Sequence, residues 1–448
     1  MPLNKLKFRP GINRDRTDLA QTGGWYDGNM VRFRDGYPEK IGGWQAETIT
    51  PYVGEATKLF VYSIDTGAEI AGLATTKKIY IRAGTTLFDI TPIRVTYTTS
   101  TTPSTDNCFT TNTTVGTEGQ VLVTLASHGA ETGDFVTFTG ATAVGGITAP
   151  QLNLEFEVTV LGGNTFTIQT AGTATGVATG GGTSITAAFQ INIGADTSVA
   201  GYGWSAGTWS RGVWGGSSVT PAIVNVRLVF MDNFNNDLIF NLNDEGAIYY
   251  WTYDNTFSNR AVLLSSLPGA IAVPTGTEKT LFAPSGHLLA LGASAYSETS
   301  TAGITIAGLV SVGTTATATT ATAHGLSTND WVYLYGQTPT AYSGTYQITV
   351  ASTTTFTYTL PASAGTVTAV GAYQAIDYTG GTYDPMLIRF ADVNADIGPK
   401  PEVWRPELAN SAGFLFVKEG SRIITGANVR QETLIWTDTS LSTLQFLG

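Results

Sequence analysis

Apolar and polar residues alternate with a period of two along most of this chain. The segments 156–160 and 331–335 are typical, because β-branched and aromatic residues recur in them between Gly, Asn, Asp and Ser. This period places successive side chains on opposite faces of a strand. Long runs of good helix formers are nearly absent, and the 52 glycines mark turns. The pattern predicts an all-β protein.

One strand motif occurs twice. Residues 128–138 begin with His-Gly and lead to Asp134, and residues 324–334 repeat this arrangement with Asp330. Each copy has a matching second half, at 156–166 and 346–356, where a β-branched strand leads to a Thr-Phe pair. Internal repetition indicates one folding unit used twice. We call these units module 1 and module 2, and the rest of the chain the host.

The distribution of positive charge separates the modules from the host independently. No Lys or Arg occurs between Arg94 and Arg211, or between Lys279 and Arg389. Both modules should therefore be small β-sandwiches or barrels with neutral to acidic surfaces, poorly suited to gripping phosphate. The predicted order is host 1–104, module 1 at 105–188, host 189–304, module 2 at 305–373 and host 374–448.

The host segments contain their own weaker repetition. Hairpins that contain an aromatic-rich strand occur at 78–89 and 238–251, and further short strands follow. Short strands with regular turn signals are typical of a sandwich, a barrel or a propeller. We favour a β-propeller-like host, because propellers tolerate domains inserted in their loops and long insertions add little loop-closure entropy. The apolar segment 444–448 predicts a strand completed by another chain or by further sequence.

Charge and composition narrow the class of protein. Only 13% of the residues are charged, and the formal net charge is -11, which opposes nonspecific adhesion to DNA or anionic membranes. The opening residues contain no run suited to a secretory signal. Cys108 is the single cysteine, so an internal disulfide is excluded, and we expect an inert thiol.

Six host segments share residues with a known family. They are 8–14 (Phe-Arg-Pro-Gly-Ile-Asn-Arg), 24–34, 38–44, 87–92 (Leu-Phe-Asp-Ile-Thr-Pro), 384–390 and 430–439. In combination they resemble the tail nozzle proteins, also called packaged-DNA stabilisation proteins, of short-tailed bacteriophages. The modules resemble small β-domains that recur in phage structural proteins. Related chains usually continue well beyond the Trp-Thr-Asp-Thr segment at 436–439, which suggests that this sequence is partial.

The resemblance implies a propeller protomer in a homo-oligomeric ring, with a hexamer expected, below the portal and the head-to-tail adaptor. Such a ring encloses the DNA exit channel, helps to retain packaged DNA and passes it at ejection without sequence specificity. Tail fibres or a tail needle are further implied partners. The protein would be assembled in the cytoplasm of the infected cell and reside in the virion tail.

Two groups of residues are candidate contact sites. The first is a basic run that could dock on the adaptor or touch DNA, with a solvated arm as the alternative. It comprises Lys5, Lys7, Arg9, Arg14, Arg16, Arg32 and Arg34. The second is Trp204, Trp209 and Trp214, which lie among Gly and Ser. These rings could stack on a ligand or pack within a blade.

Catalytic and metal chemistry find little support in the sequence. His128 and His324 precede a Gly turn at equivalent positions, so we predict that they stabilise that turn, and a similar structural role is predicted for Asp134 and Asp330. Residues 392–398 place oxygen ligands at alternate positions, but the glycine and the closing Glu of a calcium loop are misplaced, so a surface turn is favoured. We expect no enzymatic activity, no cofactor and no metal.

Three functions remain open at this point. The leading hypothesis is the tail nozzle. The alternative is a receptor-binding or glycan-binding tail component, with the modules or the tryptophan cluster contacting the surface of the infected cell. A propeller glycosidase would need two converging carboxylates, and the spacing of the sequence identifies no such pair.

Overall fold

The predicted all-β class is confirmed. The computed structural model describes residues 9–14, 17, 23–43, 50–114, 117–194, 228–243, 246–394 and 398–446. Their helical elements are α1 (Ala149–Leu152) and the two 3-10 turns η2 (Leu264–Ser266) and η3 (Thr340–Tyr342). None of the helices in these ranges is long and apolar enough to cross a membrane.

The chain divides into two units, residues 1–51 and 52–448. In the first unit, β1 (Val31–Arg34) pairs with the antiparallel strand β2 (Tyr37–Lys40). The two residues between them, Asp35 and Gly36, have φ angles of 51° and 85°. A two-residue hairpin turn of type I′ requires positive φ at both positions, and Asp-Gly adopts it readily.

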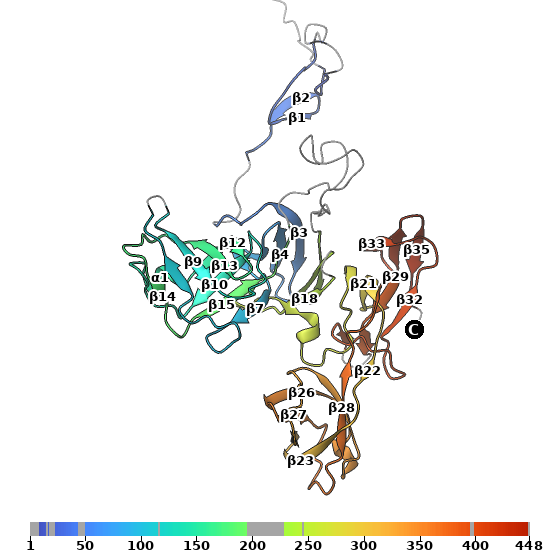
Figure 1. The fold of residues 1–448 in the computed structure, drawn as a ribbon. Coiled ribbons are helices and arrows are strands. Elements are labelled where there is room, and N and C mark those ends of the chain that lie inside the picture. Colours follow the sequence, from blue (N-terminus) through green and yellow to red (C-terminus); the bar gives the residue numbers. More distant parts are fainter. Residues whose placement is uncertain are drawn as a thin grey trace, which may run out of the picture. The chain divides into compact units, whose positions relative to one another are not determined.

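The host part of the second unit consists of meander sheets (Figure 1), which we number as blades. Blade 1 contains β3 (Ala56–Ser63), β4 (Glu69–Thr75), β5 (Ile79–Ala83) and β6 (Thr86–Asp89). Blade 2 contains β16 (Val229–Phe234), β17 (Asp237–Leu242), β18 (Ile248–Trp251) and β19 (Val262–Leu263). Blade 3 contains β20 (Thr277–Phe282), β21 (Leu288–Ser294), β29 (Tyr383–Phe390) and β32 (Gly413–Phe416). Blade 4 contains β33 (Ile423–Asn428), β34 (Thr433–Thr437) and β35 (Leu441–Leu444). A short pair, β30 (Asp392–Asn394) and β31 (Gly398–Lys400), follows β29.

Successive blades pack face to face. Phe240 of β17 lies in a core cluster with residues of blade 1, whereas its neighbour Ile239 packs in a cluster with Leu288 of blade 3. Leu289, the next residue of β21, packs in turn with Ile435 of blade 4. Because successive side chains point to opposite faces of a strand, the two inner blades bury both faces. Stacked meanders of this kind are the blades of a propeller-like host.

Module 1 lies between blades 1 and 2 in the sequence and consists of two sheets. The first contains β11 (Glu155–Glu157), β10 (Phe135–Thr139), β15 (Thr186–Gln190) and β7 (Ile93–Tyr97). The second contains β12 (Thr159–Gly162), β13 (Thr165–Gln169), β9 (Gln120–Thr124), β8 (Phe109–Thr111) and β14 (Thr179–Gly180). The strands therefore extend beyond the predicted limits of 105–188, because the incoming strand β7 pairs with the outgoing strand β15.

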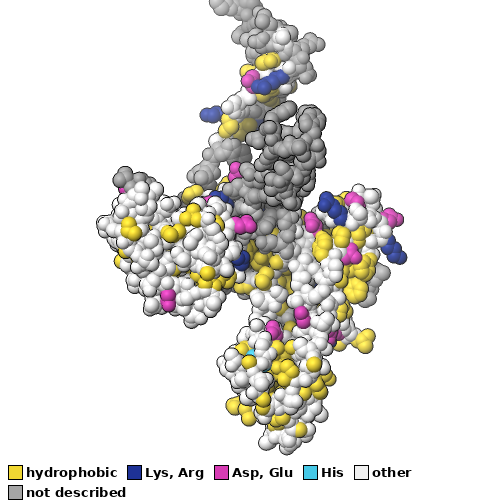
Figure 2. Space-filling view, in the orientation of Figure 1, with side chains coloured by type: hydrophobic (Ala, Val, Ile, Leu, Met, Phe, Trp, Pro, Cys, Tyr) yellow, Lys and Arg dark blue, Asp and Glu magenta, His cyan; other side chains and the backbone are white. Residues whose placement is uncertain are grey.

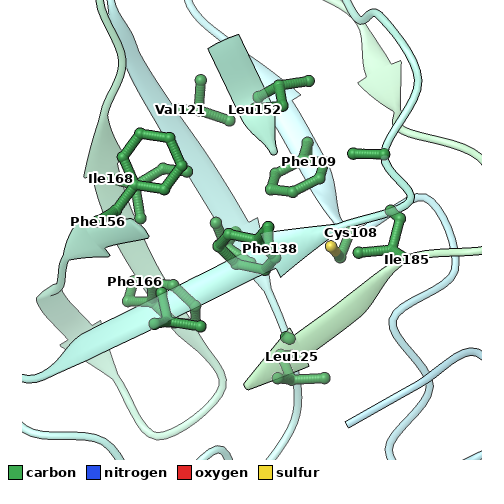
Figure 3. Packing of buried hydrophobic residues seen from close by; sticks show 14 of the residues in the cluster. Cys108, Phe109, Val121, Leu125, Phe138, Leu152, Phe156, Phe166, Ile168 and Ile185 are labelled. Atoms are coloured by element: carbon green, nitrogen blue, oxygen red, sulfur yellow. The ribbon is translucent and has the colours of Figure 1, made fainter. Parts of the chain in front are cut away.

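Aromatic side chains from both sheets fill the core of module 1 (Figure 3). Phe109 and Phe138 are fully buried, and their ring centroids lie 4.9 Å apart in an edge-to-face arrangement. Cys108 is buried beside them, and this burial raises the pKa of its thiol to about 12. The thiol therefore stays protonated at neutral pH, as the predicted inert role requires.

Module 2 is inserted in blade 3, between β21 and β29. Its strands are β22 (Thr299–Ser300), β23 (Ile304–Val312), β24 (Thr315–Thr320), β25 (Trp331–Tyr335), β26 (Gly344–Ser352), β27 (Thr355–Thr359) and β28 (Ala372–Asp377). The order β28-β23-β24-β27-β26-β25 closes on itself because β25 also pairs with β28, giving a six-stranded barrel. These strands again extend beyond the predicted limits, here 305–373.

The repeated residues hold equivalent hydrogen bonds in both modules. His128 Nδ1 accepts the backbone N–H of Ala130 at 3.0 Å, and His324 Nδ1 accepts that of Leu326 at 3.0 Å. Likewise Asp134 accepts the N–H of Glu131 at 2.9 Å, and Asp330 accepts that of Ser327 at 2.8 Å. The predicted turn-stabilising roles of both His residues and both Asp residues are confirmed.

Candidate functional site

A cleft of about 460 Å³ lies where module 2 meets the host. Its module wall comes from the start of β25 and the end of β28, and its host wall from the segment after β19. Residues with groups suited to ligand contact are Asn329, Asp330, Trp331, Asp377, Tyr378 and Thr379. Aromatic rings beside amide, hydroxyl and carboxylate groups are typical of sites that bind polar organic ligands.

Two hydrogen bonds hold the walls of this cleft together. Trp331 Nε1 donates to the carbonyl of Ala270 at 2.8 Å, and the backbone N–H of Gly269 donates to Gln347 Oε1 at 2.8 Å. The ring of Trp331 also packs against the host core and meets Tyr378 edge-on, with centroids 6.5 Å apart. The cleft is thus formed by fixed contacts within the fold.

Two carboxylates stand at the same end of the strand pair. Asp330 directly precedes Trp331 and Asp377 directly follows Ile376, and Trp331 and Ile376 are cross-strand partners. Asp377 accepts hydrogen bonds from the side chain of Thr379 at 2.6 Å and from its backbone N–H at 2.8 Å, and these bonds lower the pKa of Asp377. The carboxylate is therefore held ionised, which suits a hydrogen-bond acceptor and not the protonated acid of a glycosidase.

Module 1 meets the host through the same edge. A cavity of about 220 Å³ is lined there by Asp134 and Phe135, the counterparts of Asp330 and Trp331, and by Thr76 and Lys77 of the host. Burial raises the pKa of the Asp134 carboxyl. The ring of Phe135 lies 4.4 Å from Lys78 Nζ. Each module thus uses the start of one strand, β10 or β25, to contact the host.

Comparison with known proteins adds little to this geometry. No family model matches the sequence. No curated protein matches it either. A solved structure, the phage phi92 endosialidase, aligns with a TM-score of 0.18 and 12% identity over 92% of this chain. The aligned part spans 66% of the endosialidase, just under two thirds of its length. A TM-score this low carries no conclusion about fold or function.

The described part of the basic run lies in the first unit, where carboxylates neutralise some of it. Arg14 forms an ion pair with Asp27, and Arg32 Nε lies 2.8 Å from Glu39 Oε2 on the neighbouring strand. Arg9 and Arg34 are exposed. Lys5, Lys7 and Arg16 lie outside the described residues. The run therefore presents less net positive charge than the sequence alone indicates.

The other two candidates differ in what the structure shows of them. Trp204, Trp209 and Trp214 lie outside the described residues. In segment 392–398, where the sequence favoured a surface turn over a calcium loop, the described residues 392–394 and 398 belong to the short β30–β31 pair. The buried carboxylate of Asp392 accepts hydrogen bonds from the backbone N–H and the hydroxyl of Ser411. In the described ranges, no three His, Cys, Asp or Glu residues are grouped so as to hold a metal ion.

His287 is a buried residue whose role the sequence did not indicate. Its ring is 3% exposed, and its nitrogens lie 2.9 Å from the hydroxyl of Ser285 and 3.2 Å from that of Ser411. The rings of Phe390 and Phe446 are 5.8 Å and 4.6 Å away. Burial lowers the pKa of His287, although the charge of Asp392 opposes this shift. The imidazole is therefore neutral at pH 7.

We expect acidification to destabilise the contact between blades 3 and 4 through His287. Below the ordinary His pKa of 6.5, the unfolded chain takes up a proton that the folded chain does not, so stability falls until the pH reaches the lowered folded-state pKa. Thermal unfolding between pH 7.5 and 5.5 measures this slope. His287→Gln should flatten it, and an equal slope in the variant and the wild type would contradict this role.

Sequence reasoning missed the residues that join distant segments. Lys78 of the host binds Asp89 at 3.0 Å and also forms an ion pair with Glu155 of module 1. Arg389 of β29 is 2% exposed. The alternation of residues at 331–335 predicted a strand. The exposure of Tyr333, however, depends on which face of that strand points into the barrel.

Proposed function

We propose that this protein is a structural component of a short-tailed bacteriophage tail, namely the nozzle ring below the portal and adaptor. In this role the ring encloses the DNA exit channel, helps to retain packaged DNA and passes it at ejection. Its N-terminal basic segment would dock on the adaptor, and tail fibres or a needle would attach to it. The main support for the proposal is the place in the fold of the residues on which the resemblance to the nozzle family rests.

Three of those residues illustrate this point. Asp89 belongs to the ion-pair cluster that ties module 1 to the host, with Lys78 and Arg260 as partners at 3.0 Å and 3.3 Å. Arg389 of blade 3 donates hydrogen bonds to the backbone carbonyls of Ala272, in the segment between blades 2 and 3, and of Trp404. Asp438 accepts the backbone N–H of Ser421 at 2.7 Å. Shared residues that hold blades and junctions together suit a protein that acts by assembly.

The ends of the blade stack support contact between copies. On β3 of blade 1, Leu59 and Val61 are 60% and 52% exposed, because Phe60 and Tyr62 take the inner face. On blade 4, Leu441 is 55% exposed on the face opposite to Ile435. The two apolar faces lie at opposite ends of the stack, so contact between them would be heterologous, and heterologous contacts generate rings when the rotation closes.

The charge distribution suits passage of DNA. The net charge is -11, and no Lys or Arg occurs between Arg94 and Arg211 or between Lys279 and Arg389, the stretches that contain the modules except for the start of β7. A channel wall with this balance repels the duplex and lets it slide, whereas a cationic wall would hold it.

Native mass spectrometry of the protein extracted from particles tests the ring. We expect a closed assembly near six copies, because heterologous contact between blade faces continues until the ring closes. Leu59→Asp should abolish the assembly. Leu161→Asp, at a 63% exposed position of module 1, is the matched control and should leave it intact. A monomer or a trimer at 47.2 kDa per chain would exclude the ring and favour a receptor-binding component.

A receptor-binding or glycan-binding role is the second candidate, and the exposed aromatic face of module 2 favours it.

A further inference from the structure

The outer face of β25 carries three aromatic residues in succession. Val332 and Leu334 point into the barrel and are fully buried, so Trp331, Tyr333 and Tyr335 lie on its outer surface. Trp331 is turned to the host by its hydrogen bond to Ala270. The two tyrosines continue this row along the strand.

The two tyrosine rings form a stacked pair. Tyr333 is 44% exposed, and its ring centroid lies 5.7 Å from that of Tyr335, with an interplanar angle of 20°. A Cβ atom at Gly303 would lie 2.0 Å from the Tyr335 hydroxyl. The glycine therefore leaves the space in which this ring lies. Stacking holds the Tyr333 ring in a fixed orientation, so its exposed surface is available to a flat apolar group.

Polar groups without charge flank the Tyr333 ring. Tyr333 is the cross-strand partner of Gln374 on β28 and of Thr345 on β26. The Gln374 amide has no side-chain hydrogen bond to any residue that the structure describes. Apolar C–H faces beside free amide and hydroxyl groups match the chemistry of a sugar ring, which stacks on aromatic faces and hydrogen-bonds at its rim. A protein-docking core would instead need contiguous apolar neighbours.

The charge of the barrel indicates which class of saccharide it can bind. Residues 304–377, from β23 to the end of β28, contain two formal charges, those of Asp330 and Asp377, and no Lys or Arg. Figure 2 shows module 2, at the bottom of the view, as mostly uncharged. Phosphorylated or carboxylated glycans would find no cation here. Beyond Trp331, the cleft of about 460 Å³ offers further room for a chain of sugar units.

We propose that the outer face of β25, with Tyr333 and Tyr335 at its centre, binds a neutral saccharide chain. This goes beyond the nozzle role and does not depend on ring formation. Module 1 provides an internal comparison, because Thr137 and Thr139 occupy the corresponding outward positions of β10. A structural need of the module fold therefore does not explain the tyrosines.

The test uses the full chain on an array that carries neutral O-polysaccharides, acidic capsular polysaccharides and heparin, followed by affinity measurement in solution on the bound neutral glycan. We expect binding to neutral polysaccharide, and Tyr333→Ala should weaken it by about tenfold or more, as loss of a stacking ring does. Gly303→Ala should also weaken it by displacing Tyr335. Thr137→Ala in module 1 is the matched control and should change nothing.

Thermal unfolding of each variant verifies that the fold is intact. The proposal is overturned if no neutral polysaccharide is bound, if only the anionic glycans are bound, or if folded Tyr333→Ala binds like the Thr137→Ala control. A native mass that changes on Tyr333→Ala, without any glycan binding, would assign this face to contact between copies instead.

Discussion

Replacing Arg389 by Ala should destabilise the host by about 1.5–3 kcal/mol, the range for losing hydrogen bonds made by a charged group. The guanidinium is 2% exposed and donates to the carbonyls of Ala272 at 2.6 Å, Trp404 at 2.9 Å and Ser294 at 3.4 Å. Burial lowers the pKa of Arg389 to about 10, so the group is still charged at neutral pH. Truncation leaves these acceptors without a donor inside the fold.

The measurement is amide hydrogen exchange of the segments around Ala272 and Trp404, together with the thermal midpoint. Arg405→Ala is the matched control, because this arginine pairs with Glu298 and Glu407 near the surface and should contribute at most about 1 kcal/mol. Equal effects of the two substitutions would show that the carbonyl contacts of Arg389 do not hold the segments around Ala272 and Trp404 against blade 3.

Local patterns predicted local structure well. The two His-Gly turns could be recognised from sequence because each hydrogen bond of His128 or His324 to a backbone N–H spans two residues. Alternation likewise revealed the strands, because the side-chain period depends only on the backbone. The all-β class follows from these short-range rules.

Contacts between distant segments could not be predicted in the same way. We predicted that module 1 starts at residue 105, yet Val95 of β7 pairs with Phe189 of β15. Nothing in the residues near position 95 indicates a partner so far along the chain. The same reason explains why Lys78, Glu155 and Arg260, which meet in space, do not form a motif.

The candidate site shows a further limit. The aromatic row at 331–335 identified a strand, but a period of two does not say which face is closed into a core. Only the pairing of β25 with both β26 and β28 places Val332 inside and Tyr333 outside. The exposure of Tyr333 and Tyr335 therefore follows from the closure of the barrel and could not be predicted from the sequence.

Replacing Lys78 by Met should loosen module 1 from the host and lower stability by about 2–3 kcal/mol, because the carboxylates it leaves behind are partly screened by solvent. The Lys78 side chain is 4% exposed, whereas those of Asp89 and Glu155 are 21% and 30% exposed. Burial opposes ionisation of Asp89, but the charges of Lys78 and Arg260 and hydrogen bonds from Thr91 hold its pKa below the ordinary 3.8.

This shift also fixes the pH dependence of the effect. The stabilisation from ionised Asp89 is present above pH 3.8 and is lost as the pH falls through the lowered pKa of the folded state. Lys78→Met should therefore lose most of its difference from the wild type in strong acid. A double-mutant cycle with Glu155→Gln, followed by hydrogen exchange at β6 and β11, isolates the pair. Strictly additive effects would mean that the ion pair does not couple module 1 to blade 1.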